Sequence, residues 1–120
     1  MPKKILVVDD SPTELRLIES ALEGRGYELE TAMDGEEALD KILAGRPDLV
    51  LLDVVMPKQN GFQVCRQIKR SPLTGGTKII MITAKSQETD RFWAMKQGAD
   101  EYLTKPFSTE ELLERIGRVL

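Results

Sequence analysis

The stretch Asp48-Leu49-Val50-Leu51-Leu52-Asp53 decides the fold of this chain. Its four consecutive aliphatic residues do not alternate with polar ones, which indicates a strand buried on both faces, as in the middle of a parallel sheet. The strand ends at a carboxylate. In open α/β sheets, ligands bind at the carboxyl ends of the strands, where the connecting loops diverge. Asp53 is therefore a candidate reactive group.

Outward from this strand, the chain alternates between strand and helix patterns. Aliphatic or alternating runs predict further strands at residues 5–8, 27–32, 78–83 and 101–104. Apolar residues at helical spacing predict helices that begin near Pro12, Asp34, Asn60, Gln87 and Ser108. With short connections and right-handed crossovers, this alternation predicts an α/β fold: a doubly wound (βα)5 three-layer sandwich with a flavodoxin-like parallel sheet in the order 2-1-3-4-5.

Two local details of the helices are also predicted. Ser11 should be the N-cap of the first helix, with Pro12 at its first position and Glu14 closing a capping box. In the fourth helix, Phe92 should face the core, which leaves Trp93 nearer the surface. Trp93 is then either a partner anchor or partly packed under a neighbouring loop.

Length and composition limit the possible functions. The 120 residues suit one domain, residues 1–120, and 17 Lys and Arg against 20 Asp and Glu give no basic surface for nucleic acid. No apolar run approaches the roughly 20 residues that span a bilayer, so we expect a cytoplasmic protein without a membrane partner. The chain has no histidine, which excludes Ser-His and Cys-His catalytic pairs. The single cysteine, Cys65, is expected to be buried packing.

Polar residues follow four of the predicted strands at their carboxyl ends. Asp9 and Asp10 follow the first strand, Asp53 ends the third, Thr83 ends the fourth and Lys105 follows the fifth. Each alone has an ordinary explanation as a turn, capping or surface residue. In the predicted strand order, however, all five fall in one crevice. Three carboxylates this close repel one another unless a cation or lysine compensates, and an all-oxygen site of this kind suits Mg2+.

The residues that surround these positions resemble the receiver domain of two-component response regulators, the family of the chemotaxis protein CheY. The resemblance covers the whole chain. It is carried by Val7-Val8-Asp9-Asp10-Ser11, Leu51-Leu52-Asp53-Val54-Val55-Met56-Pro57 with Gly61, Ile82-Thr83-Ala84, and Tyr102-Leu103-Thr104-Lys105-Pro106-Phe107. The segments Ser11-Pro12-Thr13-Glu14 and Gln87-Glu88-Thr89-Asp90, with Trp93, Gln97-Gly98-Ala99 and Tyr102, further resemble the twitching-motility receivers of the PilH and PilG type.

The resemblance implies a phosphorelay signalling protein rather than an enzyme with a separate substrate. Asp53 would accept a phosphoryl group from the phosphohistidine of a histidine kinase or phosphotransfer domain. Mg2+ would be held by Asp10, Asp53, the Val55 backbone carbonyl and, through water, Asp9. Lys105 would neutralise charge on the other side of the phosphoryl group.

The resemblance also implies a conformational switch. Thr83 would hydrogen-bond the phosphoryl group and vacate space into which Tyr102 turns, which changes the surface of the fourth helix, fifth strand and fifth helix, where a downstream protein binds. Tyr102 has an alternative role as a partly buried strand aromatic. The Lys105-Pro106 peptide bond would be cis. Val55 and Lys85 stand where fast-acting members of the family carry polar side chains, so we expect a long-lived phosphorylated form.

Three rival functions fit the sequence less well. Phosphatases of the haloacid-dehalogenase type carry a second Asp two residues after the nucleophile, where this chain has Val55. A nucleotide- or flavin-binding module would need a glycine-rich loop after the first strand, where this chain has Asp9-Asp10-Ser11-Pro12. A pseudo-receiver, which signals without phosphate, has normally lost one of the five site residues, and none is lost here.

Overall fold

The structure, a computed structural model, describes residues 2–56, 60–84 and 88–120. Five parallel strands form one sheet in the order β2-β1-β3-β4-β5, as the sequence predicts. The strands are β1 (Lys4–Val8), β2 (Glu28–Ala32), β3 (Leu49–Asp53), β4 (Lys78–Thr83) and β5 (Glu101–Thr104). The helices are α1 (Pro12–Leu22), α2 (Gly35–Gly45), α3 (Gly61–Arg70), α4 (Glu88–Lys96) and α5 (Thr109–Val119). Gln87, the predicted start of α4, lies outside the described residues.

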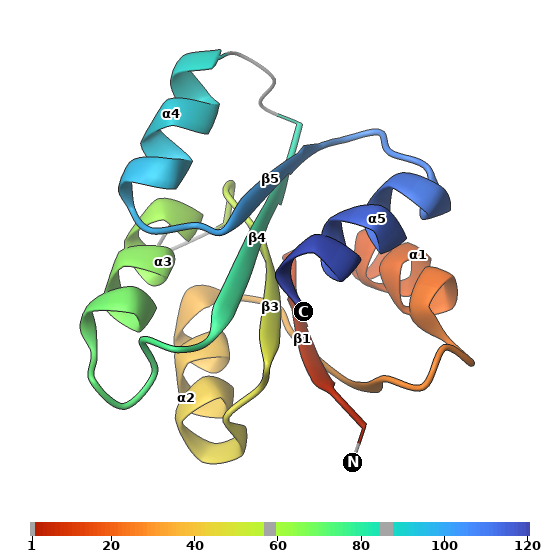
Figure 1. The fold of residues 1–120 in the computed structure, drawn as a ribbon, viewed down its shortest axis with the longest axis horizontal. Coiled ribbons are helices and arrows are strands. Elements are labelled where there is room, and N and C mark those ends of the chain that lie inside the picture. Colours follow the sequence, from red (N-terminus) through yellow and green to blue (C-terminus); the bar gives the residue numbers. More distant parts are fainter. Residues whose placement is uncertain (1, 57–59, 85–87) are drawn as a thin grey trace.

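The helices cover both faces of the sheet, which gives the predicted three layers (Figure 1). Helices α2, α3 and α4 lie on one face, and α1 and α5 lie on the other. Each face has its own apolar core. Every residue of β3 is buried, as expected for the central strand of a parallel sheet. No helix among the described residues has the length and apolar character needed to cross a bilayer.

The register of the strands fixes where their carboxyl ends meet. Val8 in β1 pairs with Leu52 in β3, so the residues that follow each of them, Asp9 and Asp53, are neighbours. On the other side of β3, Asp53 pairs with Ile82, which precedes Thr83. The polar residues therefore converge because the sheet places their strands in this order.

The predicted capping box at α1 is only half formed. Ser11 Oγ accepts a hydrogen bond from the Glu14 backbone N–H at 3.3 Å, as predicted. The Ser11 backbone N–H, however, donates to Asp9 Oδ1 at 3.0 Å instead of to the Glu14 carboxylate. In α3 and α5 both halves of the box are present. A neighbouring strand-end carboxylate therefore takes the place of the helix's own glutamate.

The prediction that Phe92 faces the core is wrong. Phe92 is 57% exposed and Trp93 is 55% exposed, and Ala94 is the residue of α4 that is buried. The small Ala94 lets the helix lie close to the sheet, where Tyr102 belongs to the same core cluster. The rings of Phe92 and Trp93 stand edge to face with centroids 6.1 Å apart, on the solvent side of the helix. Leu17 in α1 and Leu43 in α2 are also largely exposed.

Candidate functional site

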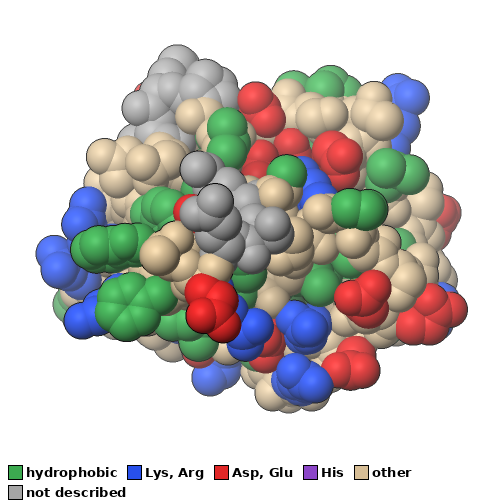
Figure 2. Space-filling model, turned by 90° about the horizontal axis from the view of Figure 1, so that it is seen from above, with side chains coloured by type: hydrophobic (Ala, Val, Ile, Leu, Met, Phe, Trp, Pro, Cys, Tyr) green, Lys and Arg blue, Asp and Glu red, His purple; other side chains and the backbone are tan. Residues whose placement is uncertain are grey.

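Three carboxylates meet at the carboxyl edge of the sheet. Oxygen atoms of Asp9, Asp10 and Asp53 lie within 4.8 Å of one another. Asp9 is 2% exposed and Asp53 is 7% exposed, whereas Asp10 faces solvent. Figure 2 looks down on this edge of the molecule, where acidic and basic side chains gather together. The cluster thus combines two buried acidic groups with one that solvent reaches, which suits a small cation that enters from water.

Lys105 is the cation that the structure places in this cluster. Its Nζ lies 2.8 Å from Asp9 Oδ2 and 4.0 Å from Asp53 Oδ1. A third carboxylate, Glu14, lies 3.7 Å away. Burial alone would lower the pKa of the Lys105 ammonium, but the hydrogen bond to Asp9 and the charges of Asp53, Asp9 and Glu14 together raise it. Lys105 therefore remains charged, and its ammonium lies closer to Asp9 than to the other two carboxylates.

The environment of Asp53 raises the pKa of its carboxyl group toward neutral pH. Burial raises the pKa of its carboxyl group to about 6, from an ordinary value of 3.8. The positive charge of Lys105 opposes this rise, the negative charge of Asp9 adds to it, and a backbone hydrogen bond from Val55 opposes it. The negative charge of Asp10 is the smallest contribution and raises the pKa further. At neutral pH the carboxylate form still predominates, so Asp53 retains the charged oxygen that a nucleophile needs.

The segment after Asp53 is held against the start of α3 by a glycine. The Gly61 backbone N–H donates to Val54 O at 2.8 Å. A Cβ atom at Gly61 would lie 2.3 Å from the backbone oxygen of Asp53, so a larger residue cannot be accommodated without moving the strand end. Val55, next along this segment, is 58% exposed. An apolar side chain therefore stands in solvent two residues beyond Asp53.

Thr83 and Tyr102 lie on neighbouring strands beside the cluster. Thr83 ends β4 and is fully buried. Its backbone oxygen accepts a hydrogen bond from the Lys105 backbone N–H at 2.8 Å, which joins β4 to the segment after β5. The Lys105–Pro106 peptide bond is cis, the form that the family resemblance implies. The five predicted positions are thus gathered at one edge of the sheet.

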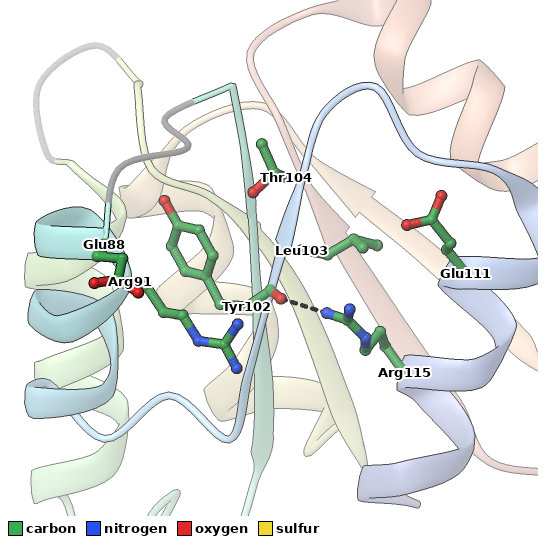
Figure 3. A pocket seen from close by; sticks show the side chains of 7 residues that line it. All are labelled: Glu88, Arg91, Tyr102, Leu103, Thr104, Glu111 and Arg115. Atoms are coloured by element: carbon green, nitrogen blue, oxygen red, sulfur yellow. Dashed lines mark hydrogen bonds between the residues drawn. The ribbon is translucent and has the colours of Figure 1, made fainter.

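Tyr102 is already buried, with 4% of its surface exposed. The expected inward turn assumed a ring that starts outside, whereas Figure 3 shows the ring on the α4 side of β5, toward Glu88 and Arg91. Burial, and then the charge of Asp90, raise the pKa of its hydroxyl to about 12. The Tyr102 backbone oxygen accepts a hydrogen bond from Arg115 Nη1 at 2.6 Å. Tyr102 also lines a cavity of about 290 Å³ between α4, β5 and α5.

Sequence reasoning missed one residue of the site, Glu14. The pattern around Ser11 assigned it to helix capping, yet its carboxylate lies near Lys105. The available signal was its position in the first turn of a helix that starts directly after Asp9 and Asp10. Lys85, which we considered together with Val55, lies outside the described residues.

Comparisons with known proteins agree with this geometry. Residues 5–117 match the family model of the response regulator receiver domain. The alkaline phosphatase synthesis transcriptional regulatory protein PhoP of Bacillus subtilis is 46% identical over 120 residues, which cover 100% of this chain and 49% of PhoP. The chain thus spans about half the length of that relative.

Two further proteins match along nearly their whole length. Protein PilH of Pseudomonas aeruginosa is 44% identical over 117 residues, which cover 98% of this chain and 97% of PilH. The crystal structure of chemotaxis protein CheY4 of Vibrio cholerae superimposes with a TM-score of 0.94 at 36% identity and covers 100% of both chains. With a CheY-like fold and a family match over almost all of its residues, this chain belongs to the response regulator receiver domain family.

Proposed function

We propose that this chain, as a single receiver domain over residues 1–120, accepts a phosphoryl group on Asp53 and signals through the resulting change of shape. The observation that carries the proposal is the position of the Asp53 carboxylate, 4.0 Å from the Lys105 ammonium and beside the carboxylates of Asp9 and Asp10. The donor is the phosphohistidine of a histidine kinase or phosphotransfer domain.

The transfer needs one nucleophile and strong charge compensation. A carboxylate oxygen of Asp53 attacks phosphorus, a new P–O bond forms, and the P–N bond breaks. The electron pair of that bond leaves with the imidazole nitrogen of the donor. Because the phosphoryl oxygens carry negative charge next to three carboxylates, positive charge must be supplied on more than one side. Lys105 supplies one part.

The carboxylate cluster fits Mg2+ as the source of the other part. The donor set is oxygen only, two of its three carboxylates are buried, and their oxygens are within 4.8 Å of one another. We assign the ion to Asp10, Asp53, the backbone carbonyl of Val55 and, through water, Asp9. When bound, Mg2+ neutralises the charge that develops on the phosphoryl oxygens.

We propose that Thr83 and Tyr102 carry the signal to the surface. Thr83 ends the strand next to β3 and directly follows Ile82, the strand partner of Asp53, which supports a hydrogen bond from its hydroxyl to a phosphoryl oxygen on Asp53. Because Tyr102 is already buried, the change is a repacking of its ring against α4 rather than a swing from solvent. Tyr102 lines the cavity between α4 and α5 together with Arg91, Glu111 and Arg115 (Figure 3). A partner that binds over this cavity therefore meets these three charged side chains.

The downstream partner is a protein that binds the face of α4, β5 and α5. The similarity to PilH, 44% identity over 98% of this chain, supports a role in type IV pilus twitching motility or in chemotaxis-like control. Phe92 and Trp93 are exposed on α4, directly after Arg91, which lines the cavity. They supply apolar area to an interface that is otherwise charged.

The first prediction tests the proposed function itself. Acetyl phosphate with Mg2+ should add one phosphoryl group to the wild type, and Asp53→Asn should abolish this because an amide oxygen is not a competent nucleophile. Intact-mass spectrometry measures the product. The exposed Asp40 of α2 provides a matched control, since Asp40→Asn makes the same chemical change away from the site. Undiminished labelling of Asp53→Asn would refute the assignment.

The second prediction concerns pH and stability without divalent ions. Because folding raises the Asp53 pKa from 3.8 to about 6, its contribution to stability is complete below pH 4 and is lost as pH rises through 6. At pH 7.5 the loss is about 2–3 kcal/mol. In EDTA, Asp53→Asn should therefore be more stable than the wild type at pH 7.5, and the difference should shrink toward pH 4. Equal denaturant unfolding curves at pH 7.5 would contradict the burial argument.

The third prediction concerns the lifetime of the phosphorylated form. Hydrolysis requires a water aligned opposite the Asp53 oxygen, and the exposed Val55 offers that water no hydrogen bond. Val55→Asn should therefore speed dephosphorylation in saturating Mg2+ by about tenfold, the effect of one positioning contact. Leu73→Asn, at another exposed position, is the control. An unchanged or slower rate in Val55→Asn would show that Val55 does not set the lifetime.

A further inference from the structure

The ammonium of Lys105 and the proposed cation compete for the same carboxylate. Asp9 Oδ2 accepts the short hydrogen bond from Lys105 at 2.8 Å. Its other oxygen, Oδ1, accepts from the Ser11 backbone N–H at 3.0 Å. Both oxygens of Asp9 are therefore engaged before any ion binds. A divalent cation that attracts the Asp9 carboxylate must weaken the hydrogen bond between Asp9 and Lys105. The cation also carries two positive charges, which repel the Lys105 ammonium.

Among the residues that the structure describes, Glu14 is the carboxylate outside the metal cluster that lies within 4.0 Å of the Lys105 ammonium. Its Oε2 is 3.7 Å from Nζ, and its side chain is 35% exposed. The corresponding residues of α3 and α5, Gln63 and Glu111, reach back to cap their own helices. At α1 the equivalent backbone N–H is taken by Asp9, and the Glu14 side chain lies near Lys105 instead.

We propose that Glu14 is a positioning residue for Lys105, a role that deepens the proposed function and rests on it. Glu14 holds the Lys105 ammonium in place when a cation attracts the Asp9 carboxylate. Its negative charge also offsets the repulsion between that cation and Lys105. Glu14 therefore strengthens Mg2+ binding by acting through Lys105. The alternative is that Glu14 only adds negative charge to the region or favours the N-terminus of α1.

A double-mutant cycle on Mg2+ affinity separates these two explanations. The dissociation constant for Mg2+ is measured by calorimetry, without phosphodonor, for the wild type, Glu14→Gln, Lys105→Met and the double variant. If Glu14 acts through Lys105, Glu14→Gln weakens binding in the wild type and has much less effect once the ammonium is gone. Because the pair is partly exposed and screened, we expect a change of about twofold to fivefold in the wild-type background.

Two further variants serve as controls. Lys105→Arg keeps the positive charge, so Glu14→Gln should still weaken Mg2+ binding in that background, and this arm remains informative if Lys105→Met folds poorly. Glu110→Gln removes an exposed carboxylate from the first turn of α5, the same kind of helix position. It should leave the affinity for Mg2+ unchanged. Melting temperatures in EDTA report whether each variant is folded.

The outcomes distinguish this inference from the proposed function. A wild-type affinity that equals that of Glu14→Gln overturns the role of Glu14, and so does an equal loss with and without the Lys105 charge. In both cases Mg2+ still binds, and the proposed function stands. A wild type that binds no Mg2+ overturns the metal assignment and this inference together. A loss that depends on the Lys105 charge supports the inference.

Discussion

The bond between Lys105 Nζ and Asp9 Oδ2, at 2.8 Å, is the interaction on which the rest of the site depends. It joins the segment after β5 to the end of β1, across the two strands that lie between them. Without it, the buried carboxylates of Asp9 and Asp53 would face each other with little compensation, which is costly in a site removed from water. The single ammonium also leaves a surplus of negative charge. That surplus makes the site receptive to a cation.

Much of this arrangement could be predicted from the sequence because it follows from strand order. The aliphatic run that ends at Asp53 identifies the central strand, and the alternation of elements leaves few possible topologies. Once the order 2-1-3-4-5 is given, the carboxyl ends of β1, β3, β4 and β5 must be neighbours. The convergence of Asp9, Asp53, Thr83 and Lys105 needs no side-chain detail.

The predictions that failed depended on contacts with residues outside the helix in question. Glu14 has the spacing of a capping residue, but Asp9 lies close enough to take the backbone N–H that Glu14 would have accepted. Phe92 has the spacing of a core residue, but α4 packs against the sheet through Ala94, which shares a buried cluster with Tyr102. In both cases a residue outside the helix decides the outcome: Asp9, two residues before Ser11, in the first case and Tyr102 of β5 in the second. Periodicity along one helix carries no information about that residue.

The site and the proposed signalling face share β5. Tyr102 of β5 lies buried on the α4 side, and its backbone oxygen accepts a hydrogen bond from Arg115 of α5. Lys105 directly follows Thr104, the last residue of β5. A shift at the end of β5 therefore reaches both helices. The most direct test is a crystal structure with beryllofluoride and Mg2+. Our account predicts beryllofluoride on Asp53, with Lys105 Nζ drawn from Asp9 toward a fluorine atom. An unmodified Asp53, with Lys105 still bonded to Asp9, would contradict it.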